Sequence, residues 1–229
     1  AAGAKLRACI ALAPEVCPAG FTDFEALVAS QADDSEPADQ SAGGPMFYTS
    51  GTTGRPKGVL KNKGATQPIA TLQAMATNLV ANLQLPADGT TLLCGPYYHS
   101  AQYAWSFQPL LAGLRVVMCQ RFDAAQTLHL IDQHRVTNLH LVPTQFIRLL
   151  KLEPEARDRY DVSSLRWVLH TAAPCPEWAK RQMIDWFGPV IIELYGSSEG
   201  VGPVIATSDE WLARPGTVGK ATAMLELSI

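Results

Sequence analysis

Residues 166–200 read RWVLHTAAPCPEWAKRQMIDWFGPVIIELYGSSEG, and this stretch decides the fold. Two short apolar runs, Arg166–His170 and Val190–Tyr195, have the length of buried strands. Between them, Glu177–Phe187 repeats apolar residues at helical spacing. A strand, a helix and a second strand in this order predict a βαβ unit, in which the two strands lie parallel.

The same alternation begins earlier in the chain, from residue 90 onward. Several of the expected strands are almost entirely apolar, as is typical where both faces of a sheet are covered. We therefore predict an α/β fold with a largely parallel sheet flanked by helices. The further strands are expected at Thr90–Cys94, Arg115–Cys119 and Leu139–Val142, and the further helices at Ala65–Leu83, Tyr103–Leu111, Ala124–His134 and Thr144–Leu150.

The first part of the chain has a different organisation. The apolar run Leu6–Leu12 predicts a buried strand. Thr22 and Glu25 have the spacing of a capping box, which predicts a short helix through Val28. A run of acidic residues without any basic residue then predicts an exposed linker. The expected divisions are a strand–helix start over residues 1–30, a linker over residues 31–44, and a ligand-binding region over residues 45–229.

The composition excludes several functional classes. Of 229 residues, 47% are hydrophobic and 17% are charged, so the chain is not disordered and can fill a sizeable core. The formal net charge of −3 argues against a nucleic-acid partner. The 5 cysteines form no C-x-x-C pair, which favours reduced thiols and a cytoplasmic location. The run Ala8–Ala13 is too short for the core of a signal peptide, and no apolar run is long enough to span a bilayer.

The segment Tyr48–Gly58, YTSGTTGRPKG, predicts a phosphate-binding loop after a short strand at Met46–Thr49. Its glycines let backbone N–H groups turn towards an anion, and its hydroxyl side chains add further donors. Lys57 adds a positive charge, and no acidic residue occurs between Asp39 and Asp88. The alternative is a simple turn that joins this strand to a second strand at Gly58–Lys61. It explains less well why glycines, hydroxyl residues and basic residues cluster here.

The spacing distinguishes this loop from a P-loop. In the G-x-x-x-x-G-K-[ST] pattern, four residues separate the glycines and a hydroxyl residue follows the lysine. Here Gly51 and Gly54 are too close, and Gly58 stands where the hydroxyl residue is required. Pro56 also removes one backbone donor.

Residues 48–59 closely resemble the phosphate-binding signature of the AMP-forming adenylate synthetases. This superfamily comprises acyl-CoA synthetases, peptide-synthetase adenylation domains and luciferases. The resemblance covers nearly the whole chain from about Leu6 onward, and it implies part of the large N-terminal domain, with ATP and Mg2+ as ligands. The loop residues that it implies in phosphate binding are Thr49, Ser50, Gly51, Thr52, Thr53, Gly54 and Lys57.

A second motif, Tyr195–Gly200, allows two interpretations. Gly196-x-Ser198-x-Gly200 matches the nucleophile elbow of α/β-hydrolases, with Ser198 as the nucleophile. Hydrolases of that fold place the catalytic histidine after the serine, whereas the last histidine here is His170. A serine hydrolase is therefore the weaker alternative.

The same motif resembles the tyrosine-glycine-x-threonine-glutamate motif of the adenylate synthetases, with serine in place of threonine. The resemblance implies that Tyr195 stacks on adenine, that Ser198 contacts phosphate and that Glu199 holds Mg2+. A carboxylate suits this hard cation, and a solvated loop carboxylate is the alternative. Residues 171–174 resemble the glycine-glycine-alanine-proline turn that lies against adenine. The nucleotide-binding residues implied by these two motifs are Ala172, Ala173, Pro174, Tyr195, Gly196 and Ser198.

His99 stands where acyl-CoA synthetases carry the histidine that lines the carboxylate pocket. Relatives that activate amino acids carry an aspartate in this stretch, but here no acidic residue occurs between Asp88 and Asp123. Because a buried ammonium without a partner is unfavourable, a fatty or other non-amino acid is the expected substrate. A structural histidine at the start of a helix is an equally good interpretation of His99.

By resemblance, the expected activity is ATP-dependent conversion of a carboxylic acid to acyl-AMP and then, with CoA, to acyl-CoA. The expected catalytic residues are Lys57, Glu199 and His99. A non-catalytic nucleotide- or acyl-binding module is the alternative, since fold alone does not prove turnover. The chain begins at Ala1 rather than a methionine, and no stretch after Glu199 resembles the family's later motifs. We therefore expect a fragment without the C-terminal domain, inactive alone in acyl-CoA synthesis.

Overall fold

The computed structural model contains two compact units, residues 1–40 and residues 41–229. The boundary between them lies inside the segment that the sequence predicts to be a linker. Among the described residues, no helix is long and apolar enough to cross a membrane. The structure describes residues 10–12, 16–31, 40–49, 54–60, 66–198 and 204–222.

The first unit shows that the predicted capping box is wrong. Asp23, not Thr22, caps the helix, because its Oδ1 accepts a hydrogen bond from the backbone N–H of Ala26 at 2.9 Å. A carboxylate there also complements the positive end of the helix dipole. Of the strand predicted at Leu6–Leu12, residues 6–9 lie outside the described part of the chain. The elements of this unit are β1 (Ile10–Ala11), β2 (Thr22–Asp23) and α1 (Phe24–Ala29).

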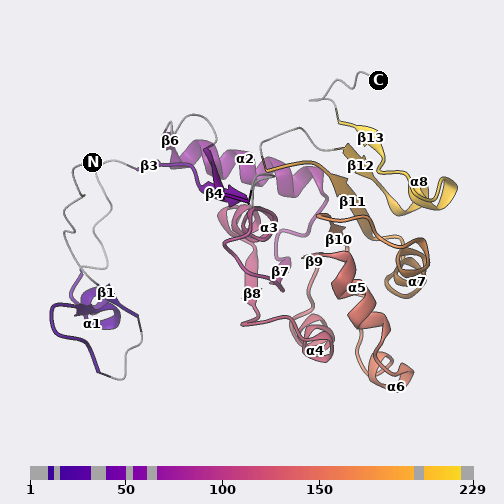
Figure 1. The fold of residues 1–229 in the computed structure, drawn as a ribbon, viewed down its shortest axis with the longest axis horizontal. Coiled ribbons are helices and arrows are strands. Elements are labelled where there is room, and N and C mark those ends of the chain that lie inside the picture. The colour runs from indigo at the N-terminus through magenta and orange to yellow at the C-terminus, as the bar shows by residue number, and fades with distance from the viewer. Residues whose placement is uncertain are drawn as a thin grey trace. The chain divides into compact units, whose positions relative to one another are not determined.

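The second unit is built on a sheet with the strand order β13-β12-β11-β10-β9-β7-β8 (Figure 1). Its parallel strands are β7 (Thr90–Leu93), β8 (Arg115–Met118), β9 (Asn138–Leu141), β10 (Trp167–His170) and β11 (Ile191–Tyr195). Two antiparallel strands, β12 (Val204–Ala206) and β13 (Lys220–Ala221), complete one side. The predicted α/β fold with a largely parallel sheet is confirmed, and each parallel strand lies within one residue of its expected bounds.

Helices cover both faces of this sheet. α3 packs against β7 and β8 and contacts α2, whereas α5 contacts both α4 and α7 (Figure 1). The side chains of β9 alternate accordingly, because Leu139 and Leu141 join the core with α4 and α5 while His140 contacts α3. The helices are α2 (Ile69–Asn82), α3 (Ser100–Leu111), α4 (Ala124–His134), α5 (Pro143–Leu150), α6 (Pro154–Arg157), α7 (Glu177–Phe187) and α8 (Ser208–Ala213).

Four shorter strands of the second unit form two separate pairs. β3 (Ser41–Ala42) pairs with β6 (Gln67–Pro68), and β4 (Met46–Thr49) pairs with β5 (Lys57–Leu60). The linker predicted to run to residue 44 is therefore wrong at β3. The helix predicted from Ala65 begins at Ile69, because β6 occupies the two residues before it.

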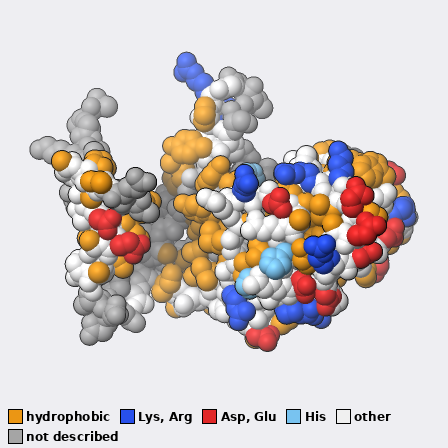
Figure 2. Space-filling view, turned by 90° about the horizontal axis from the view of Figure 1, so that it is seen from below, with side chains coloured by type: hydrophobic (Ala, Val, Ile, Leu, Met, Phe, Trp, Pro, Cys, Tyr) orange, Lys and Arg blue, Asp and Glu red, His pale blue; other side chains and the backbone are white. Residues whose placement is uncertain are grey.

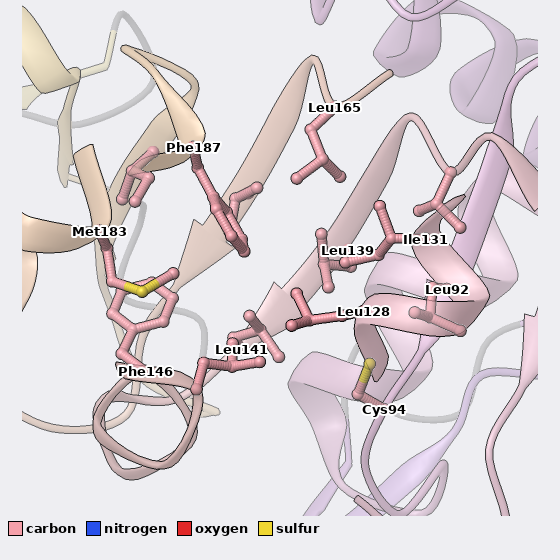
Figure 3. Close-up of a cluster of buried hydrophobic side chains, with 14 of the residues drawn as sticks. Leu92, Cys94, Leu128, Ile131, Leu139, Leu141, Phe146, Leu165, Met183 and Phe187 are labelled. Atoms are coloured by element: carbon pink, nitrogen blue, oxygen red, sulfur yellow. The ribbon is translucent and has the colours of Figure 1, made fainter. Parts of the chain in front are cut away.

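The main core lies between the sheet and α4, α5 and α7 (Figure 3). Burying a large apolar side chain completely contributes about 1.5–3 kcal/mol. Within this cluster Leu128, Leu141 and Phe146 are 0% exposed. The core holds the parallel strands at a fixed spacing, and it therefore fixes the positions of the loops that follow them.

We expect Leu128→Ala in α4 to lower the free energy of unfolding by about 2–5 kcal/mol, because it leaves a cavity in this core. Leu110→Ala is the matched control, since this leucine of α3 is 54% exposed. Urea unfolding followed by circular dichroism measures both variants. Equal losses in the two variants would show that the core is placed wrongly.

Candidate functional site

At β7 the order in which the chain adds strands to the sheet reverses, and this reversal singles out the carboxyl ends of the neighbouring strands. The chain passes from β7 through α3 to β8, and then returns through α4 to β9 on the other side of β7. Right-handed connections therefore place α3 and α4 on opposite faces. In open α/β sheets, ligands bind outside the carboxyl ends of the strands at such a reversal. The loops after β7, β9, β10 and β11 are thus the physically expected site.

Two of the sequence motifs meet at the carboxyl ends of the strands. The hydroxyl oxygens of Ser100, the first residue of α3, and Ser198, in the loop after β11, lie 3.1 Å apart. His99 caps α3, and its Nδ1 accepts a hydrogen bond from the backbone N–H of Ala101 at 3.3 Å. The structural interpretation of His99 as a helix-start residue is therefore correct, and its exposed ring leaves a ligand-binding role open.

A series of hydrogen-bonded polar side chains lies beneath these loops. Gln102 of α3 donates from Nε2 towards Nδ1 of His140 at 2.9 Å. Nε2 of His140 lies 3.0 Å from the hydroxyl of Thr171, the residue that follows β10. Burial, together with nearby His99, lowers the pKa of His140 to about 4, so its ring is neutral at pH 7. The sequence did not predict this series of hydrogen bonds, because Gln102, His140 and Thr171 are far apart in the sequence.

The turn after β10 carries backbone strain. Ala172 has a φ of +79°, in the left-handed region where glycine is favoured. Ala172, Ala173 and Pro174 are all exposed at the carboxyl edge. The turn therefore adopts the conformation of a glycine-containing loop although alanine occupies it.

The loop after β11 holds the remaining described motif residues. Tyr195 ends β11 with 61% of its surface exposed, so its ring is available to a ligand. Gly196 is exposed and Ser198 half-buried, and Glu199 lies outside the described residues. Because the hydroxyl of Ser198 pairs with another serine, which is not a general base, the geometry gives the hydrolase alternative no support.

The phosphate-loop residues lie in and around a hairpin. Thr49 at the end of β4 is paired with Lys57 at the start of β5, and Gly54 has a φ of +78°. Lys57 is exposed, and residues 50–53, which include Ser50, Gly51, Thr52 and Thr53, lie outside the described part. The ring of Phe47 in β4 packs edge-on against Tyr103 of α3, with 5.5 Å between centroids. This contact attaches the hairpin to the helix that begins at the candidate site.

The aromatic residues of α3 divide between two environments. Tyr103 stacks on Phe107 at 4.8 Å, beside the hairpin. Trp105 instead lies 6.2 Å from Trp167, at the start of β10. Each of these rings packs against another aromatic ring, which explains the spacing of aromatic residues in the helix.

A buried ion pair lies below the loops that follow β10 and β11. Nζ of Lys180 in α7 lies 2.5 Å from Oε2 of Glu193 in β11, and the lysine side chain is 0% exposed. His170, also 0% exposed, lies 3.6 Å from the same oxygen, and burial lowers its pKa to about 3. The ion pair joins α7 to the strand that ends at Tyr195. No sequence motif had indicated it.

The sheet also borders a hollow that lies away from these residues. A polar hollow of about 430 Å³ lies near the amino ends of the strands and is lined by Arg115, His134, Arg135 and Arg166, among others. Arg135 already pairs with Asp161 at 2.5 Å. Figure 2 shows basic and acidic side chains mixed over the visible face of the second unit.

We expect Ala172→Gly to stabilise the chain by about 1 kcal/mol, because relief of left-handed strain exceeds the added entropy of the unfolded chain. Ala173→Gly is the control and should destabilise, since it adds only that entropy. Urea unfolding of both variants checks this. A loss of stability in Ala172→Gly would contradict the strained turn.

Comparisons with known proteins agree with this geometry. A family model described as AMP-binding enzyme matches residues 7–229. The medium/long-chain-fatty-acid–CoA ligase FadD8 of Mycobacterium tuberculosis is 35% identical over 172 residues, which cover 75% of this chain and 28% of that protein. The 2-succinylbenzoate–CoA ligase of Bacillus pumilus is 32% identical over 185 residues, covering 80% of this chain and 36% of that protein.

Solved structures give the same result. The o-succinylbenzoate CoA synthetase of Bacillus subtilis, in complex with ATP and magnesium ion, has a TM-score of 0.69 at 26% identity, covering 89% of this chain and 41% of that one. The N-terminal domain of FACL13 from Mycobacterium tuberculosis has a TM-score of 0.70 at 25% identity, covering 92% and 53%. The chain spans about a third of the length of the curated relatives named above. It belongs to the AMP-binding enzyme family of adenylate-forming enzymes.

Proposed function

We propose that this chain carries the phosphate-, adenine- and acyl-binding part of an ATP-dependent ligase that converts a carboxylic acid to acyl-AMP and then to acyl-CoA. The contact between Ser100 and Ser198 carries the proposal. It joins the segment that holds His99 to the loop that holds Tyr195, at the edge where α/β sheets bind ligands. An acid and a nucleotide could thus be held side by side.

The proposed roles follow from the position of each residue. The loop between β4 and β5 binds the phosphates, and Lys57 at its end neutralises charge on them. Exposed Tyr195 and the turn Ala172–Pro174 hold the adenine between them. Ser198 contacts a phosphate oxygen, and His99 lines the place of the reacting carboxylate. Such a site accelerates adenylation by positioning and charge neutralisation, without covalent catalysis.

Glu199 is the proposed metal ligand. Among the described residues, no group of three His, Cys, Asp or Glu side chains converges to hold a metal ion. Proteins bind Mg2+ through one or two carboxylates together with substrate phosphates, so a single glutamate beside bound phosphates can serve as the protein ligand. When bound, Mg2+ neutralises charge on the departing pyrophosphate.

The substrate is proposed to be a fatty or other non-amino acid. The first turn of α3, which follows His99, contains no acidic residue that could pair with a substrate ammonium. The matched relatives are named as CoA ligases of a fatty acid and of 2-succinylbenzoate, and this supports both a non-amino acid and CoA as the acceptor. A role in fatty acid metabolism and a cytoplasmic location belong to the same proposal.

The whole reaction needs more than these residues. Since the chain spans about a third of its relatives, we propose that it corresponds to part of an N-terminal domain and does not synthesise acyl-CoA alone. A non-catalytic nucleotide-binding module is the alternative of a different class. Pyrophosphate exchange driven by carboxylic acids, measured on a longer protein that includes this chain, distinguishes the two.

We expect Lys57→Ala to weaken ATP binding about 10- to 100-fold, because a charge-assisted contact contributes about 1.5–3 kcal/mol. Lys151→Ala is the control, since this exposed lysine caps the far end of α5. Isothermal titration calorimetry in the presence of Mg2+ gives both affinities. Equal affinity in the two variants would remove the phosphate role of Lys57.

We expect Glu199→Gln to abolish most of the Mg2+ dependence of ATP binding, because a neutral amide is a poorer ligand for this cation. Glu155→Gln, an exposed glutamate in α6, serves as the control. ATP titrations with Mg2+ and with EDTA measure the dependence. If Glu199→Gln keeps the full Mg2+ effect, the metal-ligand proposal is wrong.

A further inference from the structure

His140 lies in β9, and its ring is between α3 and the turn that follows β10. It is 2% exposed, and each of its ring nitrogens lies within hydrogen-bond distance of a different side chain. One partner, Gln102, comes from α3, and the other, Thr171, opens the turn after β10. A neutral imidazole donates through one nitrogen and accepts through the other, so these two contacts have opposite directions.

The contacts of Gln102 decide which nitrogen of His140 carries the proton. Nε2 of Gln102 lies 2.9 Å from Nδ1 of His140 and 3.3 Å from the backbone carbonyl oxygen of His140. The carbonyl can only accept, so the atom facing both groups is the amide nitrogen and not the amide oxygen. Nδ1 therefore accepts from Gln102, and the proton resides on Nε2.

The structure holds this amide firmly in place. A Cβ at Gly95, just after β7, would lie 2.7 Å from Nε2 of Gln102, so the absence of a side chain at Gly95 leaves room for this amide. The backbone oxygen of Gln102 also accepts from the hydroxyl of Ser106 at 2.8 Å. Rotation of the amide by half a turn would place Oε1 of Gln102 against the backbone carbonyl oxygen of His140, and repulsion between these two oxygens opposes it.

The consequence reaches Thr171. Because Nε2–H of His140 donates to its hydroxyl oxygen at 3.0 Å, the hydroxyl proton of Thr171 is free to point elsewhere. Thr171 is partly exposed and immediately precedes the strained residue Ala172 at the carboxyl edge. The carboxyl ends of the strands therefore present a hydroxyl whose oxygen is held by His140 and whose proton is available to an acceptor outside the protein.

We propose that Thr171 is a ligand-binding residue whose hydroxyl, with its oxygen held by the hydrogen-bonded pair of His140 and Gln102, donates a hydrogen bond to an acceptor atom of the bound acyl-adenylate. This rests on the proposed function, because it takes the carboxyl edge as the ligand site. The acceptor belongs either to the nucleotide or to the acyl group. Gln102 and His140 are positioning residues, and they touch the ligand only through Thr171.

The test uses Thr171→Val, which keeps the shape and removes the hydroxyl, and Thr171→Ser, which keeps the hydroxyl. The two probes are AMP and an octanoyl sulfamoyl adenosine, a stable mimic of an acyl-adenylate. Loss of one neutral hydrogen bond should weaken binding about 3- to 10-fold in Thr171→Val and less than about 2-fold in Thr171→Ser. Weaker binding of both probes places the acceptor on the nucleotide. Weaker binding of the mimic alone places it on the acyl group.

Nitrogen-15 NMR of the histidine rings gives a readout that a purely structural role would not move. His140 should be the neutral tautomer with the proton on Nε2, and that proton should shift when AMP or the mimic binds. Gln102→Met, of similar length, removes the donor to Nδ1 and should allow the other tautomer to appear. This variant also identifies the His140 signal among the 5 histidines.

The outcomes separate failure of this inference from failure of the proposed function. If both probes bind the wild-type chain and Thr171→Val binds them as tightly, the inference is overturned while the ligand site stands. A proton on Nδ1 in the wild-type chain would overturn it as well. If neither probe binds the wild-type chain, the proposed function itself fails, and the inference fails with it.

Discussion

The reversal of strand order beside β7 is the constraint on which the rest of the structure depends. Since α3 follows β7 on one face and α5 follows β9 on the other, the two helices diverge from the carboxyl ends of these neighbouring strands, as they do at the ligand-binding crevice of open α/β sheets. The residues that begin α3 and the turns after β10 and β11 all border this crevice. The apolar core under α4, α5 and α7 keeps the strands in register, so the loops inherit a fixed spacing.

Polar contacts below the carboxyl ends of the strands join the elements that carry the loops of the candidate site. The ion pair between Lys180 and Glu193 and the chain from Gln102 to Thr171 are buried, and buried polar groups are tolerated when they are paired. A buried ion pair is weak evidence for stability, because desolvation offsets much of its attraction. Its observable role here is geometric, since it joins α7 to the strand that ends at Tyr195.

The sequence predicted the parts of the fold whose signals are local. The parallel strands and the helices α4, α5 and α7 were predicted to within one residue of their bounds, because each has several periodic residues. α3 was predicted from Tyr103 but begins at Ser100. Pairs such as β3 with β6 were missed, since two-residue strands have no period. The roles of the motif residues stay predictions, and the contact between Ser100 and Ser198 could not be predicted from the sequence. It joins residues 98 positions apart, and only the packed sheet brings them together. The role of Asp23 as helix cap was missed because Thr22, one residue earlier, fits the same pattern.

The central claim is that the motifs form one nucleotide site at the carboxyl edge of the sheet. A crystal structure of this chain with bound AMP tests it most directly. The account predicts adenine between the ring of Tyr195 and the turn Ala172–Pro174, with the phosphate near Ser198. AMP bound elsewhere, for instance in the polar hollow beside Arg115 and His134, with the carboxyl edge empty, would contradict it.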